Sequence, residues 1–248
     1  GCQHACIYCD SRSTCYQLGD LSDIRYKENA IEILTKELRS KKVRGTIGFG
    51  SMNDPYMPVE RKMGLTRNAL KVVSYYKFPV HIITKSNLVI RDIDLLKEIS
   101  KIYAAISFTI TTADDELAKK IEPAAPSPSE RFEAIRELNK KGIYAGITLM
   151  PVLPYINDTE QHIQLLMDKA IESGAKYIIP FFGLTLREGS REYFYEQLDK
   201  SFKGIKEKYI NTYGLSYGCN SPNADALYKL LFGTMEKYRI PKKMKFYV

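Results

Sequence analysis

Three cysteines stand within the first nine residues, in the stretch GCQHACIYCD, and they are the first candidates for chemistry. Cys2, Cys6 and Cys9 have the spacing C-x3-C-x2-C, and the chain holds only two other cysteines, Cys15 and Cys219. Three thiolates on one short loop can hold three irons of a 4Fe-4S cluster and leave the fourth iron without a protein ligand. Such an iron is open to a substrate or a cofactor. The spacing therefore favours an iron-sulfur centre.

A structural zinc site is an alternative use of the same loop. Zinc takes four ligands in a closed tetrahedron, commonly two from each of two separated knuckles, and this sequence has no second knuckle. His4 lies inside the loop, where closing a tetrahedron would strain the backbone, and Cys219 is a distant candidate. Disulfide pairing within the loop would leave one of its three thiols over. A zinc-stabilised binding protein without catalytic activity is thus the hypothesis from another functional class.

Length and composition are those of a globular protein. The 248 residues are 44% hydrophobic and 27% charged, enough for a substantial core. No stretch reaches the roughly 18 apolar residues of a membrane span or resembles a secretory segment. Together with the clustered cysteines, this predicts a cytoplasmic protein. The net charge of +8 is compatible with nucleic acid as a partner, but lysines on exposed helix faces explain it equally.

From residue 31 onward, segments with helical periodicity alternate with segments of strand character. The five strand segments are 43–50, 79–84, 103–111, 143–150 and 175–182, and a helical segment precedes each of them. Strands separated by helices pair in parallel through right-handed crossovers. The fold class is therefore α/β, and the pattern alone is compatible with an open sheet or a barrel.

The ends of two helices carry recognisable signals. Ser127 is a good N-cap, Pro128 fits the first helical position and Glu130 closes a capping box. Gly142 and Gly174 stand where helices should end.

After residue 182 the pattern becomes helical and rich in tyrosine, with a last helix expected within 221–238 and a basic tail after it. We expect one domain over 1–248. Its barrel core would span 1–182, and a helical C-terminal part, 183–248, would pack on it.

The opening loop also resembles a known family. CQHACIYC is similar to the C-x3-C-x-aromatic-C signature of the radical S-adenosylmethionine (radical SAM) enzymes. The resemblance implies that Cys2, Cys6 and Cys9 bind a [4Fe-4S] cluster, whose open iron chelates the amino and carboxylate groups of S-adenosylmethionine. Tyr8, the aromatic residue before the last cysteine, would approach the adenine.

The resemblance implies a reaction as well. One-electron reduction cleaves the sulfonium to methionine and a 5′-deoxyadenosyl radical, which abstracts hydrogen from a substrate. An external donor such as flavodoxin or ferredoxin would supply the electron. In such enzymes the cofactors carry the chemistry, while the protein orients them and excludes water.

The family fold is a full or partial TIM-like barrel, commonly of six β/α units, with the cluster loop after the first strand. Here no strand precedes the loop. The resemblance therefore implies that the first strand lies upstream of Gly1 and that the five strand segments are the second to the sixth. Sites of β/α barrels form at the carboxyl ends of their strands.

Most of the chain, from residue 1 to about 238, resembles the branch related to spore photoproduct lyase, often called DNA-repair-photolyase-like. The stretches GSMNDPYMPVE, ITKSNLVIRDIDLL, ISFTITT and IEPAAPSPSERFEAI carry this likeness. It implies that Lys85 offers a cation to the S-adenosylmethionine carboxylate and that Ser107 offers a hydroxyl beside it. Gly50 and Ser51 would replace the Gly-Gly-Glu that binds the amino group in many members.

Several polar residues have two interpretations each. Asp54 and Glu60 are either polar site groups or turn and helix-cap residues, since Asp-Pro readily initiates turns. Glu122 and Arg131 either line the mouth of the site or form a surface ion pair of little worth. A lysine at a strand end, such as Lys85, is also often simply solvated.

Two residues of spore photoproduct lyase chemistry are missing. The lyase returns hydrogen from a cysteine near the end of its second strand, where this chain has Ser51, and an alcohol O–H bond is far too strong for that role. The lyase also has a tyrosine after its third cluster cysteine, where this chain has Asp10. We therefore do not transfer the thymine-dimer substrate. The catalytic candidates that remain are Cys15, Tyr56 and Cys219.

The sequence thus predicts a radical SAM enzyme that abstracts hydrogen from an unidentified substrate. A nucleic-acid repair or modification enzyme of spore photoproduct lyase type is the narrower alternative.

Overall fold

The computed structural model describes residues 1–247, and Val248 lies outside the described part. Its main sheet consists of β1 (Ile47–Phe49), β2 (Val80–Thr84), β3 (Ala104–Thr109), β4 (Tyr144–Leu149) and β5 (Ile178–Pro180). The strands pair in parallel in the order β1-β2-β3-β4-β5. Each expected strand segment contains one of these strands, so the predicted α/β class is confirmed.

Helices connect the strands. They are α1 (Ala30–Ser40), α2 (Glu60–Met63), α3 (Leu65–Tyr75), α4 (Ile93–Ser100), α5 (Asp115–Ile121), α6 (Pro128–Lys140), α7 (Glu160–Glu172), α8 (Ser190–Ser201), α9 (Ile205–Tyr213) and α10 (Ala224–Lys237). Short 3₁₀ helices span Asp10–Arg12, Thr14–Tyr16 and Asn87–Asp92. The expected crossover helices are α1, α3, α4, α6 and α7, whereas α2 and α5 are too short to show helical periodicity. No helix within residues 1–247 is long and apolar enough to cross a membrane.

The capping box predicted for α6 is present. The Ser127 hydroxyl accepts the Glu130 N–H at 3.3 Å, and the Glu130 carboxylate accepts the Ser127 N–H at 2.8 Å. Gly142 and Gly174, which follow α6 and α7, have φ angles of 79° and 71°, as residues that end helices do. The start of α6 is therefore fixed by its own sequence.

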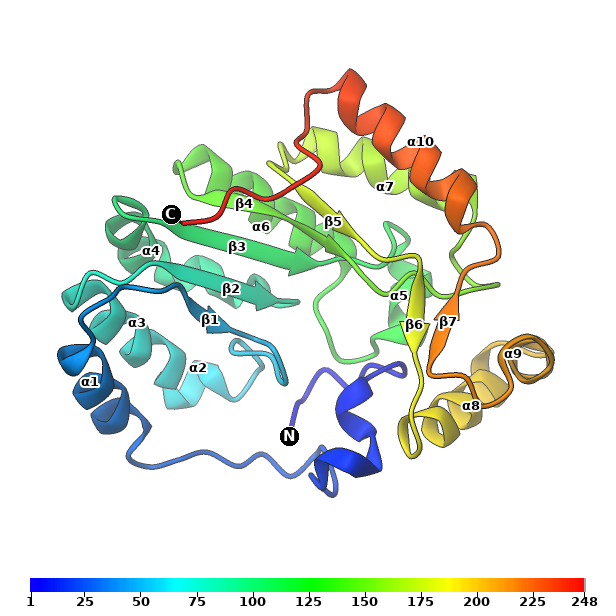
Figure 1. Cartoon of the computed structure of the whole chain (residues 1–248), viewed down its shortest axis with the longest axis horizontal. Coiled ribbons are helices and arrows are strands. Elements are labelled where there is room, and N and C mark those ends of the chain that lie inside the picture. Colours follow the sequence, from blue (N-terminus) through cyan, green and yellow to red (C-terminus); the bar gives the residue numbers. More distant parts are fainter. Residues whose placement is uncertain (248) are drawn as a thin grey trace.

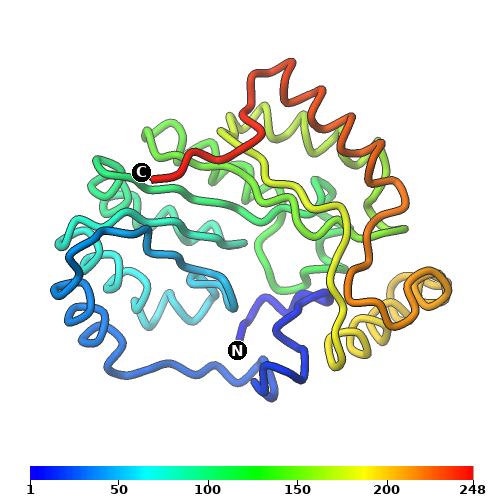
Figure 2. Tube along the Cα trace, viewed as in Figure 1, coloured from blue at the N-terminus to red at the C-terminus, as the bar shows by residue number. Residues whose placement is uncertain are grey.

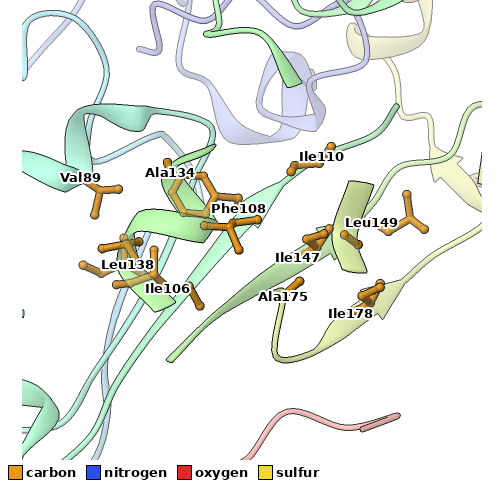
Figure 3. Close-up of a cluster of buried hydrophobic side chains, with 14 of the residues drawn as sticks. Val89, Ile106, Phe108, Ile110, Ala134, Leu138, Ile147, Leu149, Ala175 and Ile178 are labelled. Atoms are coloured by element: carbon orange, nitrogen blue, oxygen red, sulfur yellow. The ribbon is translucent and has the colours of Figure 1, made fainter. Parts of the chain in front are cut away.

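One face of the sheet packs against the helices and forms the main core. Ile106 and Phe108 of β3 and Ile147 of β4 lie beside Ala134 and Leu138 of α6 (Figure 3). Burying an aliphatic or aromatic side chain of this kind contributes about 1.5–3 kcal/mol. Because strand side chains alternate, the residues between them point to the opposite, inner face.

Side chains fill the inner face of the sheet midway along the strands. His81 Nε2 lies 2.8 Å from Ser107 Oγ, which lies 2.8 Å from the Tyr177 hydroxyl. Gly146 leaves room for the Tyr177 ring, since a Cβ there would come within 2.7 Å of it. Met244, near the C-terminus, packs against the same ring. Any open site must therefore lie nearer the strand ends.

The C-terminal part contains α8, α9 and α10 and also a two-stranded antiparallel sheet. Its strands are β6 (Gly183–Thr185) and β7 (Gly218–Asn220). The expected helices are present, and α10 lies within the predicted 221–238. This small sheet was not predicted because three-residue strands show no usable alternation. Helix α10 packs beside α7 (Figure 2), and for this reason we propose that the described chain is one domain.

The first residues of the chain lie at the carboxyl ends of the parallel strands (Figure 1). The C-terminal segment lies at their opposite ends, where the Tyr103 hydroxyl, just before β3, donates to the Lys245 carbonyl at 2.5 Å. The cysteine loop therefore faces the edge of the sheet at which sites of parallel α/β proteins form.

Candidate functional site

A cavity of about 390 Å³ lies between the opening loop and the carboxyl edge of the sheet. Every strand of the main sheet contributes a residue from its end or just beyond it: Gly50, Lys85, Thr109, Met150 and Phe181. This volume is typical of small-molecule sites. The sheet thus supplies one wall and the cysteine loop the other.

Cys2, Cys6 and Cys9 all line this cavity as free thiols. Within residues 1–247 no three His, Cys, Asp or Glu side chains are placed to hold one metal ion. A cluster does not need that convergence, because each thiolate binds a separate iron. Burial raises the pKa of Cys6 to about 12, and a cation bound to the sulfur would favour the thiolate. Three free thiols that line one cavity fit an iron-sulfur cluster.

His4 and Cys219, the two residues considered as a fourth zinc ligand, both contact other groups of the protein. The His4 ring is buried, with Nε2 at 3.0 Å from Asp54 Oδ2 and Nδ1 at 3.4 Å from the Ala124 carbonyl oxygen. Cys219, on β7, is 1% exposed and packs in a hydrophobic cluster outside the cavity lining. Neither side chain is placed to complete a tetrahedron around the loop.

Asp54 ties the loop to the sheet. Its Oδ1 accepts the Tyr56 N–H at 2.9 Å and the Thr84 hydroxyl at 2.7 Å, and its Oδ2 accepts the Lys85 N–H at 2.6 Å. Burial alone would raise the pKa of Asp54, but these bonds and the contact with His4 lower it. Asp54 also lines the cavity, so it is both a turn residue and a polar group of the site.

Glu60 has the helix-cap role. Its carboxylate accepts the backbone N–H groups of Thr66 at 3.1 Å and Arg67 at 3.2 Å, in the first turn of α3. Arg91 neutralises the carboxylate at 2.8 Å. Glu60 does not line the cavity.

The structure brings none of the catalytic candidates to the cavity lining. Tyr56 is fully buried, and its hydroxyl donates to Asp92 at 3.0 Å. Cys219 is buried, which raises its pKa to about 11. Cys15 is exposed, and its sulfur accepts from Arg187 Nη1 at 3.7 Å.

Tyr8, Gly50, Ser51 and Lys85 line the cavity as expected, but Ser107 does not. The register pairs Ser107 with Ile83, two residues below Lys85, and its hydroxyl bonds within the filled inner face. Thr109 shares that face and lies at the strand end, where it lines the cavity.

Lys85 presents a cation to the cavity. Its Nζ lies 5.6 Å from the centre of the Tyr8 ring, and no carboxylate among the described residues forms an ion pair with it. Burial alone would lower the pKa of Lys85, but the nearby Cys6 sulfur and the Glu122 carboxylate raise it. The ammonium is therefore charged and has no fixed partner.

Gly50 is required where β1 ends. Its φ is +94°, and a Cβ there would lie 2.0 Å from the Ile83 carbonyl oxygen. We expect Gly50→Ala to lower the free energy of unfolding by about 3 kcal/mol or more, or the Tm by roughly 6–12 °C. The matched control is Gly48→Ala, because no atom lies within 4 Å of a Cβ there. Equal melting temperatures for the two variants would refute the close approach at Gly50.

A polar cluster that the sequence did not reveal begins at two residues of the cavity lining, Asp10 and Tyr16, and extends beyond the lining. It consists of Asp10, Tyr16, Arg187 and Tyr217. The Tyr16 hydroxyl donates to Asp10 at 2.9 Å, and Arg187 donates to the hydroxyls of Tyr16 at 2.7 Å and Tyr217 at 3.1 Å. The Arg187 guanidinium lies 4.7 Å from the centre of the Tyr217 ring, and Tyr217 is 51% exposed. We call these four residues the rim cluster.

Glu122 and Arg131 are 2% and 0% exposed and form an ion pair beneath the cysteine loop, at 2.6 Å. The predicted ion pair is present, but it lies in the interior, so the predicted locations at the mouth and on the surface are both wrong.

Comparison with known proteins identifies the family of this chain. The family model described as the radical SAM superfamily matches residues 1–166. An uncharacterised protein of Methanocaldococcus jannaschii is 31% identical over 211 residues, which cover 84% of this chain and 77% of that protein. The radical SAM Nα-GlyT isomerase of Pseudomonas phage M6 is 29% identical over 134 residues, which cover 54% of this chain and 27% of that protein.

Among solved structures, spore photoproduct lyase complexed with dinucleoside spore photoproduct superposes with a TM-score of 0.67 at 15% identity. The superposition covers 96% of this chain and 72% of the lyase. The fold is therefore the partial TIM-like barrel that the family resemblance implied.

Proposed function

This chain belongs to the radical SAM superfamily and is a radical SAM enzyme, and we propose that it binds its two cofactors in the cavity at the strand ends. The observation that carries this proposal is that Cys2, Cys6, Cys9 and Lys85 line one cavity. When bound, the [4Fe-4S] cluster supplies the electron that cleaves S-adenosylmethionine to methionine and a 5′-deoxyadenosyl radical, which abstracts hydrogen from the substrate.

Seven of the residues that line the cavity have roles in this proposal. The three thiolates hold the cluster, and the Lys85 ammonium binds the carboxylate of S-adenosylmethionine through a charge-assisted hydrogen bond. The Gly50 backbone and the Ser51 hydroxyl bind its amino group, and the Tyr8 ring borders the adenine. Because Asp54 bonds to the Lys85 backbone and contacts His4 in the loop, the two walls of the cavity keep a fixed spacing.

A substrate and a one-electron donor complete the reaction. We propose a flavodoxin or ferredoxin as the donor and the cytoplasm as the compartment. All five cysteines are free, and thiols persist in a reducing environment.

The metal content of the anaerobically reconstituted protein tests the proposal. We expect about four irons and four sulfides per chain. One equivalent of zinc without sulfide would contradict the proposal and favour the zinc-stabilised binding protein.

A nucleic-acid substrate is the second candidate, and the rim cluster favours it. Tyrosine rings stack on nucleobases, and arginine binds phosphates. The chain carries a net charge of +8. The structural neighbour was solved with a dinucleoside lesion, although the residue differences at Ser51 and Asp10 argue against the lyase reaction itself. We therefore propose modification of a nucleoside rather than repair of a thymine dimer.

Binding of a fluorescent single-stranded oligonucleotide tests this second candidate. We expect Tyr217→Ala to weaken binding by about 1–3 kcal/mol, or about 5–150-fold, through the loss of one stacking surface. Affinity should also fall steeply between about 50 and 200 mM salt. Tyr238→Ala is the matched control, because Tyr238 is similarly exposed, at 48%, but follows α10 and does not belong to the rim cluster. Undetectable binding, or equal losses in the two variants, would remove this candidate.

A further inference from the structure

The buried ion pair beneath the cysteine loop joins the segment after α5 to the start of α6. Glu122 follows α5, and Arg131 lies in the first turn of α6. Arg131 donates to the Pro126 and Thr109 carbonyl oxygens, both at 2.8 Å, and pairs with Glu122. Within residues 1–247, Arg131 Nη2 has no hydrogen-bond partner. Two charged side chains, a guanidinium and a carboxylate, are therefore buried next to the cofactor cavity.

The same segment holds the cysteine loop. The Tyr8 hydroxyl donates to the Glu122 carboxylate. Beside it, the Ile7 N–H donates to the Ile121 carbonyl at 3.0 Å, and the Ala124 N–H donates to the His4 carbonyl at 3.2 Å. The backbone bonds alone would dock the loop, so docking does not by itself require a charged residue at position 122.

The stability of the fold does not explain why the Glu122–Arg131 ion pair is buried. Removing a carboxylate and a guanidinium from water costs several kcal/mol for each ion, and apolar residues of similar volume often stabilise a fold as well or better. Burial by itself would raise the pKa of Glu122, but the charges of Arg131 and Lys85 lower it. Glu122 is therefore an anion, and its carboxylate contacts the cysteine loop directly, because it accepts from the hydroxyl of Tyr8, which lies between Cys6 and Cys9 in the sequence.

We propose that Glu122 is a positioning residue of the cofactor site with an electrostatic role. Its carboxylate fixes the Tyr8 ring that borders the adenine, and its negative charge lowers the reduction potential of the cluster held by the three cysteines. Nearby charge and hydrogen bonds are among the features that set such potentials. A low potential suits this site because the sulfonium of S-adenosylmethionine is reduced only by a strong reductant. This inference rests on the cofactor binding proposed above.

Two substitutions separate the two parts of the role. Glu122→Gln keeps the shape of the side chain and an acceptor for the Tyr8 hydroxyl but removes the charge. Tyr8→Phe removes the hydrogen bond and keeps the charge. We expect Glu122→Gln to shift the reduction potential to a more positive value with little change in affinity for S-adenosylmethionine. Tyr8→Phe should leave the potential near that of the wild type and weaken S-adenosylmethionine binding several-fold.

The measurements are a redox titration of the reconstituted protein, followed by electron paramagnetic resonance, and anaerobic calorimetry with S-adenosylmethionine. Glu116→Gln is the matched control, because Glu116 is an exposed carboxylate on α5 whose substitution makes the same chemical change. It should leave both quantities unchanged.

Glu122→Gln leaves Arg131 buried without its partner, and the variant can therefore fail to fold. The double variant Glu122→Gln/Arg131→Gln removes both charges and keeps the local net charge of the wild type. The Glu122 carboxylate bonds to Tyr8 of the cysteine loop, whereas Arg131 bonds to Glu122 and to the Pro126 and Thr109 carbonyl oxygens, so loss of the carboxylate should outweigh loss of the guanidinium. The potential of the double variant should therefore be more positive than the wild-type value but less positive than the value for Glu122→Gln. A merely structural role would move the potential of both variants alike or of neither.

The inference is overturned if Glu122→Gln and Glu116→Gln have the same potential, or, where only the double variant folds, if its potential equals the wild-type value. In either case a wild type that holds its cluster and cleaves S-adenosylmethionine leaves the proposed function standing. A wild type that holds no cluster overturns both.

Discussion

Replacing Cys6 by alanine should abolish the iron-sulfur centre. Cys6 is the middle ligand of the proposed three and is buried, so no water or neighbouring thiol replaces its sulfur. Changes around a metal ligand cost roughly 10–100-fold in metal affinity, and loss of the ligand itself should cost more. Iron and sulfide analysis after reconstitution and desalting, with the visible absorption of the cluster, measures the effect.

Cys15→Ala is the control for this experiment. Cys15 is an exposed cysteine of the same N-terminal segment, six residues after Cys9, and lies outside the cavity lining. Its substitution should leave the iron and sulfide content at the wild-type level. Full iron and sulfide in Cys6→Ala would show that the loop does not hold the cluster.

Replacing Lys85 by methionine should have the second largest effect, on the binding of S-adenosylmethionine. Methionine keeps the apolar stem and removes the ammonium, while the Lys85 N–H that bonds to Asp54 remains. A hydrogen bond to a charged group contributes about 1.5–3 kcal/mol, which corresponds to about 10–150-fold in Kd. Anaerobic calorimetry of the reconstituted variant measures this loss.

Lys119→Met supplies the comparison, because Lys119 is an exposed lysine on α5 that pairs with Glu116 at 2.6 Å. Lys85→Arg should recover part of the affinity by restoring a cation. If Lys85→Met binds S-adenosylmethionine as tightly as the wild type, the ammonium is a solvated strand-end lysine and has no role in the cofactor site.

The elements that local signals specify were predictable from the sequence. Periodicity located all five parallel strands, and the capping box at Ser127 fixed the start of α6. The placement of the site at the carboxyl ends of the strands followed from the parallel sheet. The cysteine spacing predicted its chemistry.

The depth of a residue within the sheet was not predictable. Alternation places Ser107 and Thr109 on the same face, but their distance from the site depends on how β3 aligns with β2. The register that pairs Ser107 with Ile83 puts Thr109 level with Lys85. A single sequence contains no signal for that alignment.

Contacts between distant segments also escaped prediction. Arg187 bonds to Tyr16 across 171 positions, and it follows β6, a three-residue strand that pairs with the distant β7. The burial of Glu122 and Arg131 was not predicted. Charged side chains are almost never fully buried unless they are paired, and from the sequence the pairing of these two residues was only one of two interpretations. Their enclosure depends on how the turn between α5 and α6 folds under the cysteine loop.

The most direct test of the central claim is the formation of 5′-deoxyadenosine. Reconstituted protein is incubated anaerobically with S-adenosylmethionine and dithionite, and the product is measured by mass spectrometry. We expect 5′-deoxyadenosine from the wild type and none from Cys6→Ala. Its absence from wild-type protein that holds about four irons per chain would contradict the account and assign the opening thiols to structure or electron transfer.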